Sequence, residues 1–137
     1  MTIDSANLEV LCPGECFALA GTVPIGRIVF TDQALPAVQP VNFLIDHDGC
    51  VIIRTAQGSK LAAATRNAVV AFQIDEFDPR FEAGWSVTMV GRAQVVRDPD
   101  EVARLARLPL HAWAPGTRDH FIRVRPERIS GRRIPPL

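Results

Sequence analysis

The residues best suited to do chemistry in this chain are basic and hydroxyl side chains gathered around one glycine turn. Lys60 is the single lysine among fifteen basic residues, and all the others are arginines. Before it come a β-branched run (Val51–Ile53), then Arg54, and then Gly58 and Ser59, which suit a turn and a helix N-cap. The free N–H groups and positive dipole end of such a helix attract anions. The spacing therefore predicts a phosphate site, and the alternative is that Lys60 is a solvated first-turn residue of an ordinary surface helix.

Familiar catalytic and metal-binding motifs do not occur in this chain. The sequence lacks G-x-G-x-x-G, G-x-x-x-x-G-K-[ST], G-x-S-x-G and H-E-x-x-H. Their absence argues against a hydrolase, a kinase or a dinucleotide-binding protein. The histidines are not spaced as zinc ligands, so we expect no metal site and assign no general acid or base. The odd number of cysteines and the absence of C-x-x-C predict reduced thiols at Cys12, Cys16 and Cys50.

Length and composition restrict the class of protein. The chain has 137 residues, of which 47% are hydrophobic, enough for one domain over residues 1–137 with its own core. Fifteen basic residues balance fifteen acidic ones, so neither nucleic acid nor an anionic membrane is the expected partner. We see no membrane span or signal peptide in the sequence and expect a cytoplasmic protein.

The pattern of apolar residues and turn residues predicts many strands and few helices. Helices are expected at Glu15–Ala20, at 59–66, and after Asp98, where an N-cap is followed by proline and carboxylates. A break is expected at Asp75–Arg80, and Gly91 marks a bulge within the longest strand. The expected strands are Ile28–Phe30, Ala37–Ile45, Cys50–Thr55, Ala68–Ile74, Trp85–Val96, His120–Val124 and Arg128–Ile134. The fold class is therefore mainly β, an antiparallel barrel of six to seven strands with two or three short helices.

The order of these segments resembles the pyridoxamine 5′-phosphate oxidase-like FMN-binding split barrels, particularly a short branch that includes nitroimidazole-resistance reductases. The resemblance runs from about Leu19 to Ile134. The matching pieces are Gly26–Phe30, Pro40–Leu44, Ile53–Leu61, Val69–Phe72 with Asp75, Gly84–Val87 and Val90–Ala93. The resemblance implies a split β-barrel.

The resemblance also implies cofactor-binding residues. The flavin phosphate would be surrounded by Arg54, Thr55, Ser59 and Lys60, where the helix-start argument already places an anion. The isoalloxazine ring would lie along Pro40, Val41, Asn42 and Phe43, because a flavin needs both backbone polar groups and apolar surface.

Family members are homodimers with two flavins in the interface, which implies that some site residues come from the partner. Trp85 and Ser86, or the loop with His111 and Trp113, would reach the cofactor of the other subunit. The long strand Trp85–Val96 is apolar on both faces, as expected if one face meets the barrel core and the other meets a partner.

The function implied is that of an FMN-dependent oxidoreductase that passes hydride to an unidentified small molecule. Bound flavin would carry the chemistry, and the protein would position it. The chain lacks tyrosine, unlike the oxidase that named the family, which argues against a vitamin substrate. A deazaflavin-dependent reductase and a flavin- or haem-binding module without turnover remain the alternatives.

Overall fold

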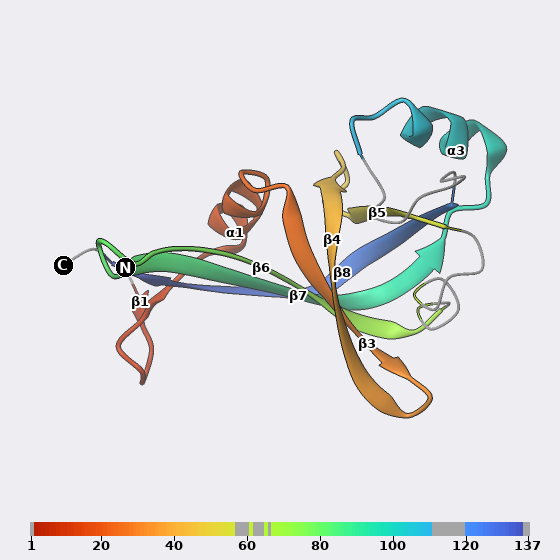
Figure 1. The fold of residues 1–137 in the computed structure, drawn as a ribbon. Coiled ribbons are helices and arrows are strands. Elements are labelled where there is room, and N and C mark those ends of the chain that lie inside the picture. The colour runs from red at the N-terminus through yellow and green to blue at the C-terminus, as the bar shows by residue number, and fades with distance from the viewer. Residues whose placement is uncertain (1, 57–60, 62–64, 66, 111–119, 136–137) are drawn as a thin grey trace.

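The computed structural model describes residues 2–56, 61, 65, 67–110 and 120–135, which form a mainly β structure. The long strands cross near the middle of the view, α3 lies at one end, and α1 lies nearer the end that holds β1 and the last residues of β8 (Figure 1). The elements in chain order are β1 (Thr2–Ile3), β2 (Glu9–Val10), α1 (Pro13–Ala20), β3 (Ile25–Asp32), β4 (Leu35–Ile45), β5 (Val51–Thr55), β6 (Val69–Asp78), β7 (Ala83–Val95), α3 (Pro99–Ala106) and β8 (His120–Ile134).

The strands form one antiparallel sheet that closes on itself. The order is β1-β2-β8-β5-β4-β3-β6-β7, and an additional pairing of β8 with β7 joins β3 to β8 in a ring. Closure removes most of the free sheet edges. This confirms the predicted antiparallel barrel.

Side chains alternate between the inside and the outside of the ring. Ile28, Phe72, Val87 and Met89 point inward and are fully buried in the main core. The opposite face of the same strands carries an apolar row of four directly paired residues, Val38, Val29, Ala71 and Val90. We call these four residues the outer valine row. Val38 is 62% exposed, and Val29, Ala71 and Val90 are partly buried in the single chain.

A second, smaller core lies between α3 and the ring. Its buried members are Ile52, Val96, Leu105, Leu110 and Phe121, and we call these five residues the satellite core. The helix begins as predicted, because the Asp98 carboxylate accepts a hydrogen bond from the Asp100 N–H over 3.1 Å.

The predicted break at Asp75–Arg80 is wrong, since β6 continues to Asp78. Outward-facing polar groups are paired here: the Gln73 side chain donates to Asp75 over 2.6 Å, and Arg27 forms an ion pair with Asp75. Charged residues on a solvated face therefore do not end the strand. β8 is likewise one continuous strand, where the sequence predicted two.

The predicted strand Ile28–Phe30 is too short, because a two-residue turn was not recognised. Gln33 and Ala34 connect β3 and β4 with φ of 51° and 67°. Positive φ at both positions is the geometry of a two-residue type I′ hairpin turn, which normally has asparagine or glycine at these positions. The turn Asp46–Gly49 is confirmed, with Gly49 at φ 80°.

Gly91 lies where the ladder between β7 and β8 shifts register, as predicted. A Cβ atom there would lie 1.9 Å from the carbonyl oxygen of Arg125, a backbone atom that cannot move away as a side chain can.

We expect Gly91→Ala to lower the free energy of unfolding by about 3 kcal/mol, measured by urea denaturation. Gly14→Ala is the control, because a Cβ on that helical residue meets nothing within 4 Å. Equal stability of the two variants would contradict the prediction.

Candidate functional site

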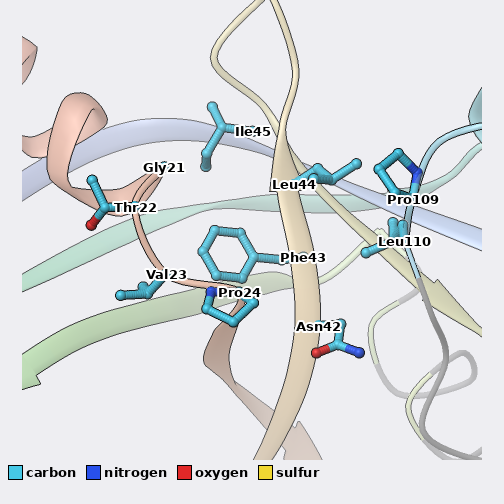
Figure 2. Close-up of a pocket in the computed structure, with 10 residues that line it drawn as sticks. All are labelled: Gly21, Thr22, Val23, Pro24, Asn42, Phe43, Leu44, Ile45, Pro109 and Leu110. Atoms are coloured by element: carbon cyan, nitrogen blue, oxygen red, sulfur yellow. The ribbon is translucent and has the colours of Figure 1, made fainter.

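A largely apolar cavity of about 450 Å³ opens beside the second half of β4. Its size lies in the usual range for small-molecule and cofactor sites. In Figure 2 the Phe43 ring lies beside Val23 and Pro24 on one side of the β4 ribbon, and Leu110 and Pro109 lie on the other side of it. The described lining residues are Gly21, Thr22, Val23, Pro24, Asn42, Phe43, Leu44, Ile45, Pro109 and Leu110, and none of these ten has an ionisable side chain.

Three segments that are distant in the sequence form the cavity walls. The connection from α1 to β3 is fixed where α1 ends, because the Thr22 hydroxyl donates to the Leu19 carbonyl over 2.7 Å. The same connection is joined to β4 by the Phe43 N–H, which donates to the Pro24 carbonyl over 3.3 Å. The Phe43 ring packs edge-on against Phe72 with centroids 4.9 Å apart, so the main core positions this wall.

Arg54 connects the end of β5 to the third wall. Its Nη1 donates a hydrogen bond to the carbonyl oxygen of Leu110 over 3.2 Å. Its guanidinium carbon lies 5.3 Å from the centroid of the Phe121 ring, a favourable cation–π arrangement. Arg54 and Phe121 are paired across β5 and β8, which places both on one face. A guanidinium is therefore held at the wall of an uncharged cavity.

Ion pairs anchor the helix that precedes this wall. Arg123 on β8 donates from Nη2 to Glu101 Oε1 over 2.6 Å, and its Nε lies 3.7 Å from Asp46 Oδ2. Hydrogen bonds from Arg104 and Arg123 lower the pKa of Glu101 to about 2. Glu101 is therefore charged throughout the physiological pH range, and the anchor of α3 persists there.

The structure brings together several of the residues expected to bind a cofactor. Pro40, Val41, Asn42 and Phe43 lie in β4, and the last two line the cavity. Arg54 and Thr55 end β5, the strand next to β4, with Thr55 only 8% exposed. Ser59, Lys60, His111 and Trp113, and most of the expected helix 59–66, lie outside the described residues.

Trp85 and Ser86 lie elsewhere in the chain. They lie near the start of β7, which is separated from β4 within the sheet by β3 and β6. Trp85 is 8% exposed and belongs to the main core, whereas the Ser86 hydroxyl accepts a hydrogen bond from Gln73 over 3.3 Å. In one chain, therefore, these residues do not meet the cavity.

Sequence reasoning missed two of the three walls. The segments 21–24 and 109–110 carry no polar pattern that suggests a site, and they line the cavity through backbone and apolar groups. The available signals were Gly21 after the first helix and the two prolines, Pro24 and Pro109, which stiffen connections.

Other reactive groups in the described part of the chain offer little chemistry. Burial raises the pKa of the Cys16 and Cys50 thiols, so they are protonated at neutral pH. The described residues contain no group of three or more histidine, cysteine or carboxylate side chains placed to hold a metal ion. No described helix is both long and apolar enough to span a membrane.

Comparisons with known proteins connect this geometry to a family. Residues 13–133 match the family model described as pyridoxamine 5′-phosphate oxidase. An uncharacterised protein of Mycobacterium tuberculosis, Rv0080, is 44% identical over 125 residues, which are 88% of this chain and 81% of that protein.

Two solved structures have the same fold and related sequences. The FAD binding protein from Mycobacterium smegmatis is 39% identical, with a TM-score of 0.77 over 90% of this chain and 96% of that one. A conserved protein of unknown function from Corynebacterium diphtheriae is 30% identical, with a TM-score of 0.75 over 91% of this chain and 96% of that one.

Proposed function

We propose that this chain, which belongs to the pyridoxamine 5′-phosphate oxidase family, binds a flavin nucleotide in the cavity beside β4. The observation that carries the proposal is an uncharged cavity of about 450 Å³ with a guanidinium fixed at its wall. A flavin has a flat, largely apolar ring and an anionic phosphate, so it needs both environments.

The residues present fit such a ligand. Phe43, Leu44 and Pro109 offer apolar surface to a ring, and the Asn42 amide provides donors and an acceptor for its polar edge. Arg54, with Ser59 and Lys60 from the sequence argument, would hold the phosphate. These residues bind and orient the ligand.

The two candidates for the bound flavin are FMN and FAD. The single anion site argued from Arg54, Ser59 and Lys60 favours FMN. The Mycobacterium smegmatis protein, at 39% identity, is described as FAD-binding, which favours FAD. Mass spectrometry of the small molecule released when the purified protein is denatured distinguishes FMN, FAD, a deazaflavin and haem.

We propose further that the protein is an oxidoreductase. Bound flavin supplies two-electron transfer to a small molecule when it is reduced. The cavity walls would exclude water from the ring, and among the described lining residues no ionisable group stands ready to act as general acid or base.

One spectroscopic experiment separates an enzyme from a binding module. The purified protein should show flavin absorption that a reduced nicotinamide bleaches and that recovers when an electron acceptor is added. A flavin spectrum that no physiological reductant bleaches would support a carrier or sensor instead. Protein that binds neither FMN nor FAD on reconstitution would overturn the proposal.

We also propose that the protein works as a homodimer with two sites at the interface. The outer valine row is apolar, and in the single chain Val38 is exposed and the other three members are only partly buried. Ile25, on the same outer face, pairs with Asn42, which lines the cavity, so this face leads directly to the site. A partner packed on the row would therefore lie beside the cavity.

Whether Trp85 lies near the partner's flavin in the proposed dimer can be tested by fluorescence. In a Trp113→Phe background, all tryptophan emission comes from Trp85, because the chain has two tryptophans. If the partner's flavin lies near Trp85, FMN should quench a large share of this emission. Trp85→Phe should weaken flavin retention less than Trp85→Ala, which also removes a buried side chain and should cost about 2 kcal/mol or more. Unchanged emission on reconstitution would leave Trp85 as a core residue only.

A further inference from the structure

Leu110 belongs to two environments at once. Leu110 is one of the residues that line the cavity, and its side chain, which is 2% exposed, is also part of the satellite core. Its carbonyl oxygen accepts the hydrogen bond from Arg54 over 3.2 Å. A movement of Leu110 would therefore change the cavity shape and the packing under α3 together.

The wall that contains Leu110 is joined to the barrel by packing in the satellite core and by the Arg54 hydrogen bond. Within the wall, the Leu108 N–H donates to Leu105 over 3.1 Å and the Leu110 N–H donates to Leu108 over 2.7 Å. These bonds shape the segment but do not fasten it to the barrel. The fastening that the structure describes at this end is the packing of Leu108 and Leu110 with the satellite core and the Arg54 hydrogen bond. The ion pairs of Glu101 fasten the other end, at the start of α3.

We propose that Arg54 is a positioning residue that couples the anion end of the site to the shape of the ring cavity. A guanidinium presents five N–H donors in a planar fork, so one edge can hold a carbonyl while another meets a phosphate. Phe121 beneath it limits the positions that the guanidinium can take. An anion bound at Arg54 therefore fixes the guanidinium, which fixes the Leu110 carbonyl and the wall.

This coupling rests on the proposed flavin function and adds ligand discrimination to it. A ligand with both a flat ring and a phosphate gains affinity in two ways. Its phosphate binds Arg54, and through Arg54 it also stabilises the wall that the ring contacts. Thermodynamic linkage requires the reverse as well, so a ring in the cavity raises the affinity for the anion. A residue that only binds phosphate would affect ligands that carry phosphate and no others.

The experiment compares Arg54→Met with Arg125→Met. Methionine keeps an apolar stem over Phe121 and removes the donors, and Arg125 is an exposed arginine that serves as the matched control. Hydrogen exchange of the amides of residues 105–108 and of Leu110 is measured with and without inorganic phosphate. Riboflavin and FMN affinities are then measured by titration of the same apo proteins.

We expect exchange in the wall to be about tenfold faster in Arg54→Met than in Arg125→Met, the scale of one hydrogen bond from a charged donor. Inorganic phosphate should slow this exchange in the wild type and in Arg125→Met, but not in Arg54→Met. Riboflavin should lose about tenfold in affinity in Arg54→Met, and FMN should lose more than riboflavin.

Four results would overturn the coupling. These are unchanged wall exchange in Arg54→Met, wild-type wall exchange that does not respond to phosphate, an FMN loss with no riboflavin loss, and equal losses of both ligands. The last result would make Arg54 a structural residue only. If the wild type binds no flavin, the proposed function fails, and the exchange measurements still decide whether Arg54 couples an anion to the wall.

Discussion

Lys60→Ala should weaken FMN binding by about 10- to 100-fold and leave riboflavin binding unchanged. A flavin phosphate is close to a dianion at neutral pH, and moving it into a partly closed site requires compensating charge and donors. Charge-assisted hydrogen bonds contribute roughly 1.5–3 kcal/mol each, which sets the expected range. Titration of apo wild type and Lys60→Ala with each ligand, followed by flavin fluorescence, measures the difference.

The comparison of two ligands distinguishes the loss of a phosphate contact from a general loss of folding. A misfolded variant would lose riboflavin and FMN together, whereas a missing phosphate contact affects FMN alone. Arg80→Ala is a suitable control, because its side chain is 82% exposed and its described contacts are with the nearby residues Asp78 and Phe81. If FMN affinity is unchanged in Lys60→Ala, or both ligands lose equally, Lys60 is a surface lysine and the phosphate binds elsewhere.

The parts of the fold that the sequence predicted well depend on local chemistry. Asp98 caps α3 because its carboxylate is followed by proline and two acidic residues, a pattern that specifies a helix start by itself. Gly91 was recognisable as a bulge because glycine inside an apolar strand usually marks a bulge or a close approach of backbone. The turn Asp46–Gly49 was equally clear.

The parts that were missed depend on contacts between distant residues. Nothing local in the sequence shows that Arg27 on β3 pairs with Asp75, so the acidic stretch after Ile74 looked like a break. The continuity of β8 has a similar cause, because this strand pairs with β5 at one end and β7 along its length. Only closure of the ring makes that long strand necessary.

The candidate site divides in the same way. Its anion end was expected because charge and a helix start attract phosphate by general rules, and of the residues in that argument Arg54 lies beside the cavity wall. The phosphate site itself stays a prediction, because Ser59 and Lys60 lie outside the described residues. The walls at 21–24 and 109–110 were not predictable, because apolar and backbone surface has no sequence signature of binding. Burial of apolar surface is decided by tertiary packing.

The apolar face of the barrel leads to the second large expected effect, dissociation of the proposed dimer by Val38→Glu. The wild type should have twice the 15.0 kDa mass of one chain by light scattering, with an interface on the order of 2,000 Å² or more. Val38 is exposed and lies in the outer valine row, so glutamate there is harmless in a monomer. In a dimer the same carboxylate would be buried without a partner, which typically costs several kcal/mol.

Leu35→Glu is the matched control for this prediction. Leu35 is 68% exposed and lies on the same strand, but at the hairpin turn and an odd number of residues from Val38, so it is not part of the row. We expect Leu35→Glu to remain a dimer that retains flavin, and Val38→Glu to become a folded monomer that loses flavin during gel filtration. Flavin retained by a monomeric Val38→Glu would place the whole binding site within one chain. A wild-type mass near 15.0 kDa with flavin bound would show that the outer valine row has another role.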